Sequence, residues 1–577
     1  MRRFRNSWSA RAALFVSLLL LSGACTEEVE VPRPSESVEV LAEAWESSDA
    51  GTMLETFDES SASAWTETEL QTWLDETLIA GGIESFVVEP GSLETPQVES
   101  EEELEGLETS APYTISYTSS VATEPVEFEG TLDLTYGEAE GWQIAWSEAN
   151  MWPGIEGAAG FAIDAKKAKR GKIVDRNGKT LATGPAKSRR YPHGSVAGST
   201  IGHIEPVSKK EADEVHKEGD LVGASGLELG LEDLLTAGAG GDLFVVDERG
   251  KKLEVVGSSP PGKPDDVKVT LDIEIQRAAE NAYGGTTGGA VVINPKNGDL
   301  LAVVSSSPFD PNNYVGVPDI APFNRALSGT YAPGSSMKVV TASAALDTGV
   351  VKPNTTVTGP KEYKGVHNFE SGEFGSIPFS VATQNSVNTA FAQIAEELGA
   401  KTMTKYAERF GFNEKPTMPL EAATPSFPFP DDLGDLMWGS IGQAQVIATP
   451  LQMATVAATV ANDGVRMEPR ILKADAPEGE RAMSKGAARK MTDLMELVVT
   501  GGTGTAANLG TPTVAGKTGT AEVYVDGGIK NHAWFICFAP SDDPEVAVAV
   551  VSELGGIGGQ VAAPLARQIL QAVLPLT

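Results

Sequence analysis

The chain has 577 residues, which is too many for a single hydrophobic core, so about two to four domains are expected. Hydrophobic residues at 41% and charged residues at 21% are typical of a folded globular protein and exclude a disordered chain or a polytopic membrane protein. The formal net charge of −36 argues against nucleic acid as a partner, because phosphates repel an acidic surface. Arg33 is the one basic residue between Thr26 and Met151, and this acidic stretch is interpreted as a solvated surface.

The first 25 residues have the pattern of a targeting segment. A basic start precedes an apolar stretch at 12–21, which is short for a membrane span and suits the core of a signal peptide. The segment from Leu21 to Cys25 resembles the lipobox of bacterial lipoproteins, whose cysteine is diacylated, although Ser22 stands at a position that is usually aliphatic. Lipidation of Cys25 is therefore predicted, with an uncleaved anchor helix as the alternative. Either anchor would hold the rest of the chain at the extracytoplasmic face of the bacterial cytoplasmic membrane.

Cysteine and histidine usage disfavours disulfide and metal chemistry. Cys25 and Cys537 are the two cysteines, so lipidation of the first would leave no disulfide within the chain. Cys537 lies in an apolar run, 533–538, and is predicted to be a buried core thiol. The five histidines stand far apart without metal-ligand spacing, which disfavours a zinc hydrolase. The sequence implies neither a metal nor a cofactor.

An acidic linker at 26–34 leads into the first expected domain, residues 35–152. Ser35 or Ser37 can cap a helix whose apolar residues follow helical spacing through 38–45, and a second such face lies at 70–78. The pattern then alternates over 126–136 and again over 142–146, which predicts an antiparallel hairpin. This order of elements indicates a small α+β domain.

Two further domains are expected. In residues 155–264, Asn177 and Gly178 predict a tight turn between two short strands, and the Pro- and Gly-rich stretch 258–264 reads as a linker. Residues 268–577 form the largest domain. Its start predicts a helix through Ile275 and then two strands, 289–293 and 300–304, joined by a turn.

The strongest chemical signal begins at Ser335. Ser335 and Lys338 are three residues apart at the start of a helix expected over 337–346, which ends at Gly349, so hydroxyl and amine share one helix face. A lysine whose pKa is lowered by burial or by a second cation can take the proton of a serine nucleophile. This pair alone is weak, because a Ser-x-x-Lys spacing is common by chance.

Two later triplets strengthen the signal from Ser335 and Lys338. Ser386-Val387-Asn388 lies in the apolar stretch 380–395, and Lys517-Thr518-Gly519 lies with Thr520 in a strand-like run, 513–525. The hydroxyls of Thr518 and Thr520 can bind a carboxylate, and Gly519 can let a substrate backbone lie close. The order and spacing of the three motifs are far more specific than any one of them.

With these motifs the sequence resembles the penicillin-binding protein and serine β-lactamase superfamily. The resemblance implies that Ser335 is the nucleophile and Lys338 its base. It implies that Ser386 relays a proton to the leaving amine and that Lys517 completes the electrostatics of the site. It also implies that Asn388, Thr518, Gly519 and Thr520 bind the substrate. The backbone N–H groups of Ser335 and Thr520 would form the oxyanion hole.

The segment 170–178 and later landmarks resemble the class B, monofunctional penicillin-binding proteins. The first domain resembles the NTF2-like extension of methicillin-resistance-type members. The implied fold is a multidomain α+β chain with an NTF2-like cone (35–152), an elongated pedestal or dimerisation domain (155–264) and a transpeptidase domain (268–577). That domain would combine an antiparallel sheet flanked by helices with a mostly helical subdomain. The implied partners are D-Ala-D-Ala stem peptides, β-lactam antibiotics and a polytopic membrane glycosyltransferase.

Other functions stay open at this point. A D,D-carboxypeptidase or β-lactamase would pass the same acyl-enzyme to water, but this needs a dedicated deacylation base that the sequence does not reveal. A non-catalytic β-lactam sensor or divisome scaffold is the third possibility. Peptidoglycan D,D-transpeptidation through an acyl-enzyme at Ser335 is the function that the motifs favour.

Overall fold

The computed structural model describes residues 29, 31–166, 170–210, 218–236, 240–261, 264, 266–306, 309–313, 323–473, 478–525 and 527–577. These residues form two compact units. Unit 1 holds the described residues up to 166 together with 240–261, and unit 2 holds those of 170–236 and 264–577. The predicted signal segment with Cys25 lies outside the described residues, as does most of the linker 26–34. Within the described ranges, no helix is both long and apolar enough to span a bilayer.

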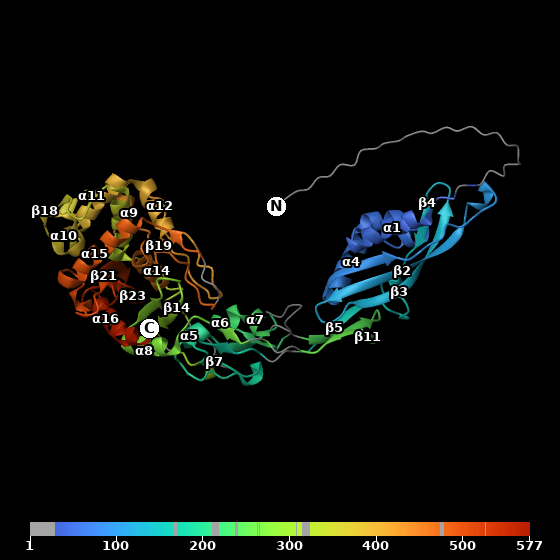
Figure 1. Cartoon of the computed structure of the whole chain (residues 1–577), viewed down its shortest axis with the longest axis horizontal. Helices are drawn as coiled ribbons and strands as arrows, with labels where there is room; N and C mark the ends of the chain where they lie inside the picture. Colours follow the sequence, from blue (N-terminus) through green and yellow to red (C-terminus); the bar gives the residue numbers. More distant parts are fainter. Residues whose placement is uncertain are drawn as a thin grey trace, which may run out of the picture. The chain divides into compact units, whose positions relative to one another are not determined.

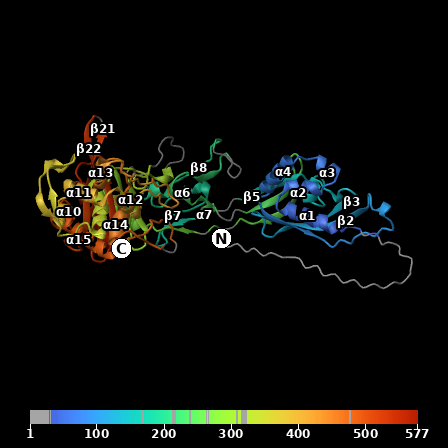
Figure 2. The same cartoon turned by 90° about the horizontal axis from the view of Figure 1, so that it is seen from above.

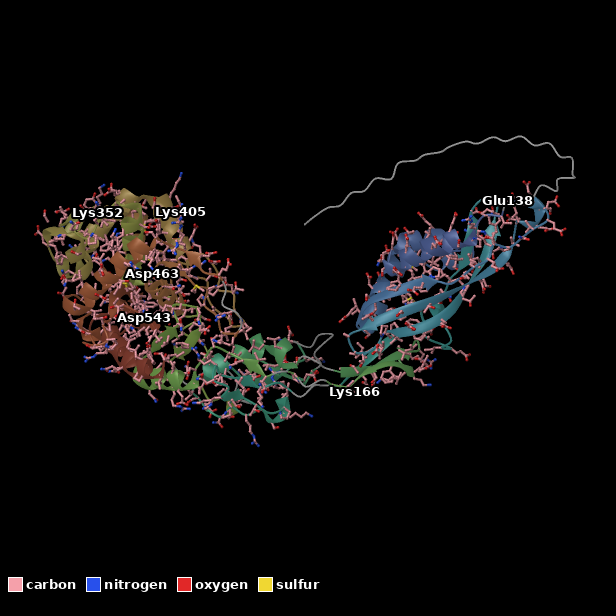
Figure 3. All side chains as sticks on the ribbon, viewed as in Figure 1. Glu138, Lys166, Lys352, Lys405, Asp463 and Asp543 are labelled. Carbon is pink, nitrogen blue, oxygen red and sulfur yellow. The ribbon has the colours of Figure 1, made fainter. Side chains whose placement is uncertain are left out.

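Unit 1 packs helices against an antiparallel sheet (Figure 1). The helices are α1 (Pro34–Glu46), α2 (Ala50–Thr56), α3 (Glu59–Ser63) and α4 (Glu67–Ala80). The sheet order is β1-β2-β3-β4, formed by β1 (Ile83–Pro90), β2 (Glu108–Ser119), β3 (Val126–Gly137) and β4 (Gly141–Ala145). Figure 3 shows oxygen atoms at many side-chain tips over this unit, in keeping with its acidic composition.

The sequence predicted part of this unit. The two helical faces correspond to α1 and α4, and the hairpin is confirmed as β3 paired with β4. The caps proposed at Ser35 and Ser37 are wrong, because α1 already begins at Pro34, a residue whose fixed φ suits the first helical turn. Strands β1 and β2 were not predicted, although buried and exposed positions alternate along β2.

A second sheet belongs to the same unit. Its order is β11-β10-β5, from β5 (Gly160–Lys166), β10 (Gly240–Val246) and β11 (Lys252–Ser259). Buried Phe161, Leu243 and Val245 join the core that contains Trp45. The sequence analysis had assigned these strands to the pedestal, whereas the structure groups them with unit 1 because their buried face packs into its core.

The first part of unit 2 is built from short elements. One sheet has the order β12-β6-β7, from β6 (Ile173–Val174), β7 (Thr180–Ala182) and β12 (Val267–Lys268), and β8 (Ile204–Pro206) pairs with β9 (Leu221–Gly223). The predicted turn at Asn177-Gly178 does join β6 to β7, with Gly178 at a φ of +86°. The helices here are α5 (Gly198–Ile201), α6 (Gly226–Gly230) and α7 (Glu232–Thr236).

The larger part of unit 2 is organised by an antiparallel sheet of order β14-β13-β23-β22-β21. Its strands are β13 (Gly288–Ile293), β14 (Leu300–Ser305), β21 (Ala515–Val525), β22 (Gly528–Ala539) and β23 (Val546–Ser552). Helices α8 (Ile273–Tyr283) and α16 (Ala562–Val573) cover one face, and α14 (Pro450–Ala461) packs on the other. Strands β13, β14 and β23 are therefore apolar runs, and Cys537 in β22 is fully buried as predicted.

A mostly helical part completes unit 2. It contains α9 (Lys338–Thr348), α10 (Phe379–Gln384), α11 (Asn388–Leu398), α12 (Ala400–Arg409) and α13 (Leu433–Ser440), and α15 (Lys485–Gly501) packs beside β21 and α9. The short pairs are β15 (Thr356–Gly359) with β18 (Gly375–Pro378), β16 (Glu362–Tyr363) with β17 (Val366–His367), and β19 (Val465–Arg466) with β20 (Glu480–Arg481). Figure 2 shows the hairpin of β21 and β22 extending beyond the body of the unit.

A buried ion network holds α6 to the chain around it. Glu228 is fully buried and accepts hydrogen bonds from Arg170 Nε at 2.8 Å and Arg189 Nε at 2.7 Å. Arg170 also reaches Glu232 at 2.8 Å. Removal of the central carboxylate would leave two guanidinium groups without their buried partner.

We expect Glu228→Gln to destabilise unit 2 by about 3–5 kcal/mol, the usual cost of breaking a buried ion pair from one side. Hydrogen-exchange mass spectrometry should show faster amide exchange in peptides that cover α6 and α7. Glu274→Gln is the matched control, because Glu274 pairs with Lys179 at 2.8 Å on the exposed surface and should change exchange little. Equal effects of the two substitutions would contradict this interpretation.

Candidate active site

Ser335 lies in the turn that leads into α9. A single 3-10 turn, Gly334–Met337, precedes the helix, and Ser335 is partly exposed while the next residues of the turn are buried. The predicted helix after it is confirmed as α9, which ends before Gly349 in the left-handed conformation. Ser335 lines a cavity, and within the described part of the chain its hydroxyl forms no hydrogen bond, to Lys338 or to any other residue.

Ser386 occupies the connection between α10 and α11. Its φ of +56° is in the left-handed region, which costs a non-glycine residue about 1–2 kcal/mol. Asn388 is the first residue of α11, and its Nδ2 donates to the carbonyl of His367 at 2.9 Å. The left-handed backbone at Ser386 and the hydrogen bond from Asn388 to His367 hold the side chains of Ser386 and Asn388 on the same side, toward the cavity.

Strand β21 contributes the third motif. Lys517 is fully buried, whereas Thr518 and Thr520 line the cavity. Thr518 Oγ1 shares a hydrogen bond of 2.7 Å with Thr503 Oγ1, and Thr520 Oγ1 accepts from the N–H of Gly558 at 3.1 Å. These contacts leave both hydroxyls with further hydrogen-bonding capacity.

Two glycines bring β21 against the turn that carries Ser335. A Cβ at Gly519 would lie 2.6 Å from the carbonyl oxygen of Pro333, and one at Gly334 would lie 2.5 Å from that of Thr520. Gly334 also has a φ of +53°. The sequence analysis expected Gly519 to make room for substrate, whereas in the structure the chain itself fills that space.

The amine of Lys338 joins the first motif to the second. Lys338 is 1% exposed, and its Nζ lies 2.8 Å from the carbonyl oxygen of Ser386, 3.1 Å from Ser386 Oγ and 2.5 Å from Asn388 Oδ1. Lys517 Nζ approaches the same Ser386 Oγ at 2.9 Å and also the carbonyl of Thr518 at 3.0 Å. One hydroxyl therefore bridges the two buried amines.

Burial shifts both amines toward their neutral forms. Desolvation lowers the pKa of Lys517 to about 7. Desolvation, helped by the positive charge of Lys517, lowers the pKa of Lys338 well below its usual value. A neutral Lys338 keeps two N–H groups for the Ser386 carbonyl and Asn388 Oδ1, and its lone pair is then available to accept a proton.

These groups open onto a cavity of about 440 Å³. Five of the eight site residues expected from the motifs line it: Ser335, Ser386, Asn388, Thr518 and Thr520. Lys338 and Lys517 lie directly behind them, and Gly519 packs against the Ser335 turn. Sequence reasoning did not identify other lining residues as part of the site: His367, Phe369, Asn385, Trp438, Ile441, Gln443, Thr503, Thr505, Glu522, Ile557, Gly559 and Gln560.

The chemistry available here is that of an activated serine. Among the described residues, no three His, Cys, Asp or Glu side chains gather in a way that could hold a metal ion. The arrangement instead offers a hydroxyl nucleophile, an amine base, a bridging hydroxyl and hydroxyl groups for a carboxylate. Such a set supports acyl transfer from an amide to another acceptor.

Comparison with known families agrees with this chemistry. Residues 288–571 match the penicillin binding protein transpeptidase domain, and residues 183–269 match the penicillin-binding protein dimerisation domain. Peptidoglycan D,D-transpeptidase PbpA of Mycolicibacterium smegmatis is 35% identical over 57% of this chain and 77% of its own length. Peptidoglycan D,D-transpeptidase MrdA of Acinetobacter baumannii is 30% identical over 66% of this chain, which spans 65% of that relative's length.

Solved structures show the same similarity. The D,D-transpeptidase domain of a peptidoglycan glycosyltransferase from Eggerthella lenta is 30% identical, covers 71% of this chain and 99% of its own, and superposes with a TM-score of 0.58. Pseudomonas aeruginosa PBP2 in complex with WCK 5153 is 29% identical, covers 71% of this chain and 96% of its own, with a TM-score of 0.61.

The lowered pKa of Lys517 predicts a pH-dependent stability. Between about pH 7 and 10 the unfolded state holds a proton that folded Lys517 has lost, so unfolding becomes less favourable as the pH rises. Relative to Lys517→Met, the intact chain should gain about 1.4 kcal/mol of stability per pH unit in this range. Pulse proteolysis in urea at pH 7.5 and 9.5 would measure the difference for unit 2. A difference that does not change with pH would show that Lys517 stays protonated in the fold.

Proposed function

This chain belongs to the class B penicillin-binding proteins, which are serine-type peptidoglycan D,D-transpeptidases, and we propose that Ser335 is its acylated nucleophile. The observation that carries the proposal is the bridge from Lys338 through Ser386 to Lys517 at the cavity that Ser335 lines. A bridge of this kind moves a proton between nucleophile and leaving group without bulk water.

In the first step, Ser335 Oγ attacks the carbonyl carbon of the peptide bond between two D-alanines. Lys338, neutral because it is buried, accepts the hydroxyl proton as the C–O bond forms. The proton then passes by way of Ser386 Oγ to the nitrogen of the terminal D-alanine. Cleavage of the C–N bond releases D-alanine and leaves an ester on Ser335.

The second step reverses the proton path. The amine of a neighbouring stem peptide enters in place of D-alanine and attacks the ester carbonyl. Ser386 and Lys338 take up its proton and return one to Ser335 Oγ as the C–O bond breaks. The products are a cross-linked peptide and the free serine.

Backbone and hydroxyl groups of β21 bind the substrate in this proposal. The N–H groups of Ser335 and Thr520 form the oxyanion hole, and each such donor is worth about 3 kcal/mol of the barrier. Its support is the close approach of β21 to the Ser335 turn that Gly334 and Gly519 permit. Thr518 and Thr520 hold the terminal carboxylate, a group that β-lactams share, and Asn388 binds the peptide on the acyl side.

We propose that Cys25 is lipidated and anchors the chain at the extracytoplasmic face of the membrane, in keeping with the lipobox-like segment. The order of helices followed by a curled sheet in unit 1 supports an NTF2-like domain of the methicillin-resistance type. Glycan polymerisation would come from a membrane glycosyltransferase partner.

Penicillin labelling tests the nucleophile. Intact-mass spectrometry should find one benzylpenicilloyl adduct per chain, mapped by peptide to Ser335, and Ser335→Ala should carry none. The adduct should persist for many minutes, because Glu522, the one carboxylate among the described lining residues, is exposed and not held in place as a base for water. Rapid loss of the adduct would favour a β-lactamase or carboxypeptidase. A folded chain that never forms one would favour a sensor or scaffold without catalysis.

Lys338→Met should slow acylation by penicillin about 10²–10⁴-fold, the usual contribution of a general base. Methionine keeps the length and apolar stem of the side chain, so the fold of α9 should be preserved. Time courses of labelling by a fluorescent penicillin, stopped at set intervals, would give the second-order rate constants of acylation. Lys405→Met changes an exposed lysine on α12; it is the matched control and should leave the rate unchanged. An equal rate in Lys338→Met would exclude Lys338 as the base.

A further inference from the structure

A glycine-rich loop, residues 554–560, follows β23 and forms one wall of the cavity. The loop residues that line the cavity are Ile557, Gly559 and Gln560. Gly558 lies so close to β21 that a Cβ on it would come within 2.2 Å of the carbonyl oxygen of Gly519. Four of the seven loop residues are glycines, which have no side chains to pack, so hydrogen bonds to the loop backbone must set its position.

Two side chains of the hairpin formed by β21 and β22 hold this loop. The N–H of Gly558 donates to Thr520 Oγ1 at 3.1 Å. At the start of the loop, the N–H of Leu554 donates to Nδ1 of His532 at 3.2 Å. Leu554 has a left-handed φ of +51°, a conformation that a leucine keeps only where its surroundings enforce it. The hydrogen bond to His532 is one of the contacts that enforce it.

His532 also contacts the segment that leads to Ser335. The imidazole packs edge to face on the ring of Tyr331, four residues before Ser335, with 5.2 Å between the ring centres. In the sheet, His532 pairs with Ala521, the residue after Thr520. The imidazole therefore lies where three parts of the site meet: strand β21, the glycine-rich loop and the segment before the nucleophile.

The charged groups around His532 leave its Nδ1 available as an acceptor. Glu553 acts on the imidazole, but its carboxylate already accepts hydrogen bonds from the Tyr331 hydroxyl at 2.5 Å and from Arg325 Nε at 2.9 Å. Lys530, on the same face of β22, is exposed to solvent. Burial lowers the pKa of His532 more than the charge of Glu553 raises it. The ring is therefore neutral at neutral pH, and one nitrogen of a neutral imidazole accepts a hydrogen bond.

We propose that His532 is a positioning residue whose unprotonated Nδ1 latches the glycine-rich loop to β22 and so keeps the cavity in the shape that acylation needs. This inference rests on the proposed transpeptidase function and adds a control of the site by pH. Protonation turns Nδ1 into a donor, which cannot bond to the N–H of Leu554. The loop then loses its first anchor, and the cavity wall beside Thr520 is free to shift.

Two substitutions separate the hydrogen bond from the titration. In His532→Asn the amide oxygen takes the place of Nδ1 and accepts at every pH, whereas His532→Leu fills similar space without an acceptor. Acylation of the full-length protein by a fluorescent penicillin gives a second-order rate constant for each variant between pH 4.5 and 8.5. Each constant is divided by the wild-type value at the same pH, which cancels the titration of Lys338 and Lys517 because all the proteins share it.

At pH 8 we expect His532→Asn to react at the wild-type rate and His532→Leu to react about fivefold more slowly, the effect of one lost hydrogen bond. Below the usual pKa of histidine, about 6.5, the ratio of His532→Asn to wild type should rise toward about five, because only the wild type loses its acceptor. His193→Asn is the matched control. His193 is also half-buried with a lowered pKa but does not line the cavity, so its ratio should stay at one.

A ratio for His532→Asn that stays at one over the whole pH range would overturn the latch. A wild-type rate in His532→Leu at pH 8 would also overturn it, as would a His532→Asn variant that is as slow as His532→Leu. If His532→Leu does not fold, the pH dependence of His532→Asn decides alone, since this variant keeps the hydrogen bond. A wild-type chain that forms no adduct at any pH would overturn the proposed function itself.

Discussion

Everything at this site depends on two amines buried without a carboxylate partner. Lys338 and Lys517 both lie within hydrogen-bonding distance of one hydroxyl, and neither pairs with Asp or Glu in the described structure. Burying two unpaired ammonium groups side by side would cost several kcal/mol each, so the fold lowers their pKa values instead. Loss of charge is what turns an ordinary lysine into a base that can serve near neutral pH.

The backbone, more than the side chains, sets the distances between the three motifs. Ser386 holds a left-handed φ, and Gly334 and Gly519 let two segments approach more closely than any side chain would allow. Strain of this kind persists only where the surroundings enforce it. Here α9 and α11 are buried along most of their length, so the connection before Asn388 has little freedom to relax.

The sequence predicted the site better than it predicted the domains. The motifs place a serine and a lysine one helical turn apart, and the strands predicted at 289–293, 300–304 and 513–525 are confirmed as β13, β14 and β21. Glu522 and Thr503 were missed because their importance comes from neighbours distant in sequence: strand alternation beyond Thr520 in one case, the contact with Thr518 in the other. Strands β5 and β10 pair across a long stretch of chain, and local patterns carry no information about such pairing.

The position of β21 at the edge of its sheet explains how one strand can supply two kinds of group. Lys517 faces the core shared with α9, whereas Thr518 faces the opposite side of the sheet. If β21 were a central strand, the strands on both sides of it would separate the Lys517 side chain on one face of the sheet from the Thr518 side chain on the other. At an edge, Thr518 can line the open cavity while Lys517 lies buried directly behind it, and the outer side of the strand can pair with an extended ligand. A buried amine and a cavity-lining hydroxyl on consecutive residues can therefore act on one substrate, because β21 is the last strand of its sheet in the described part of the chain.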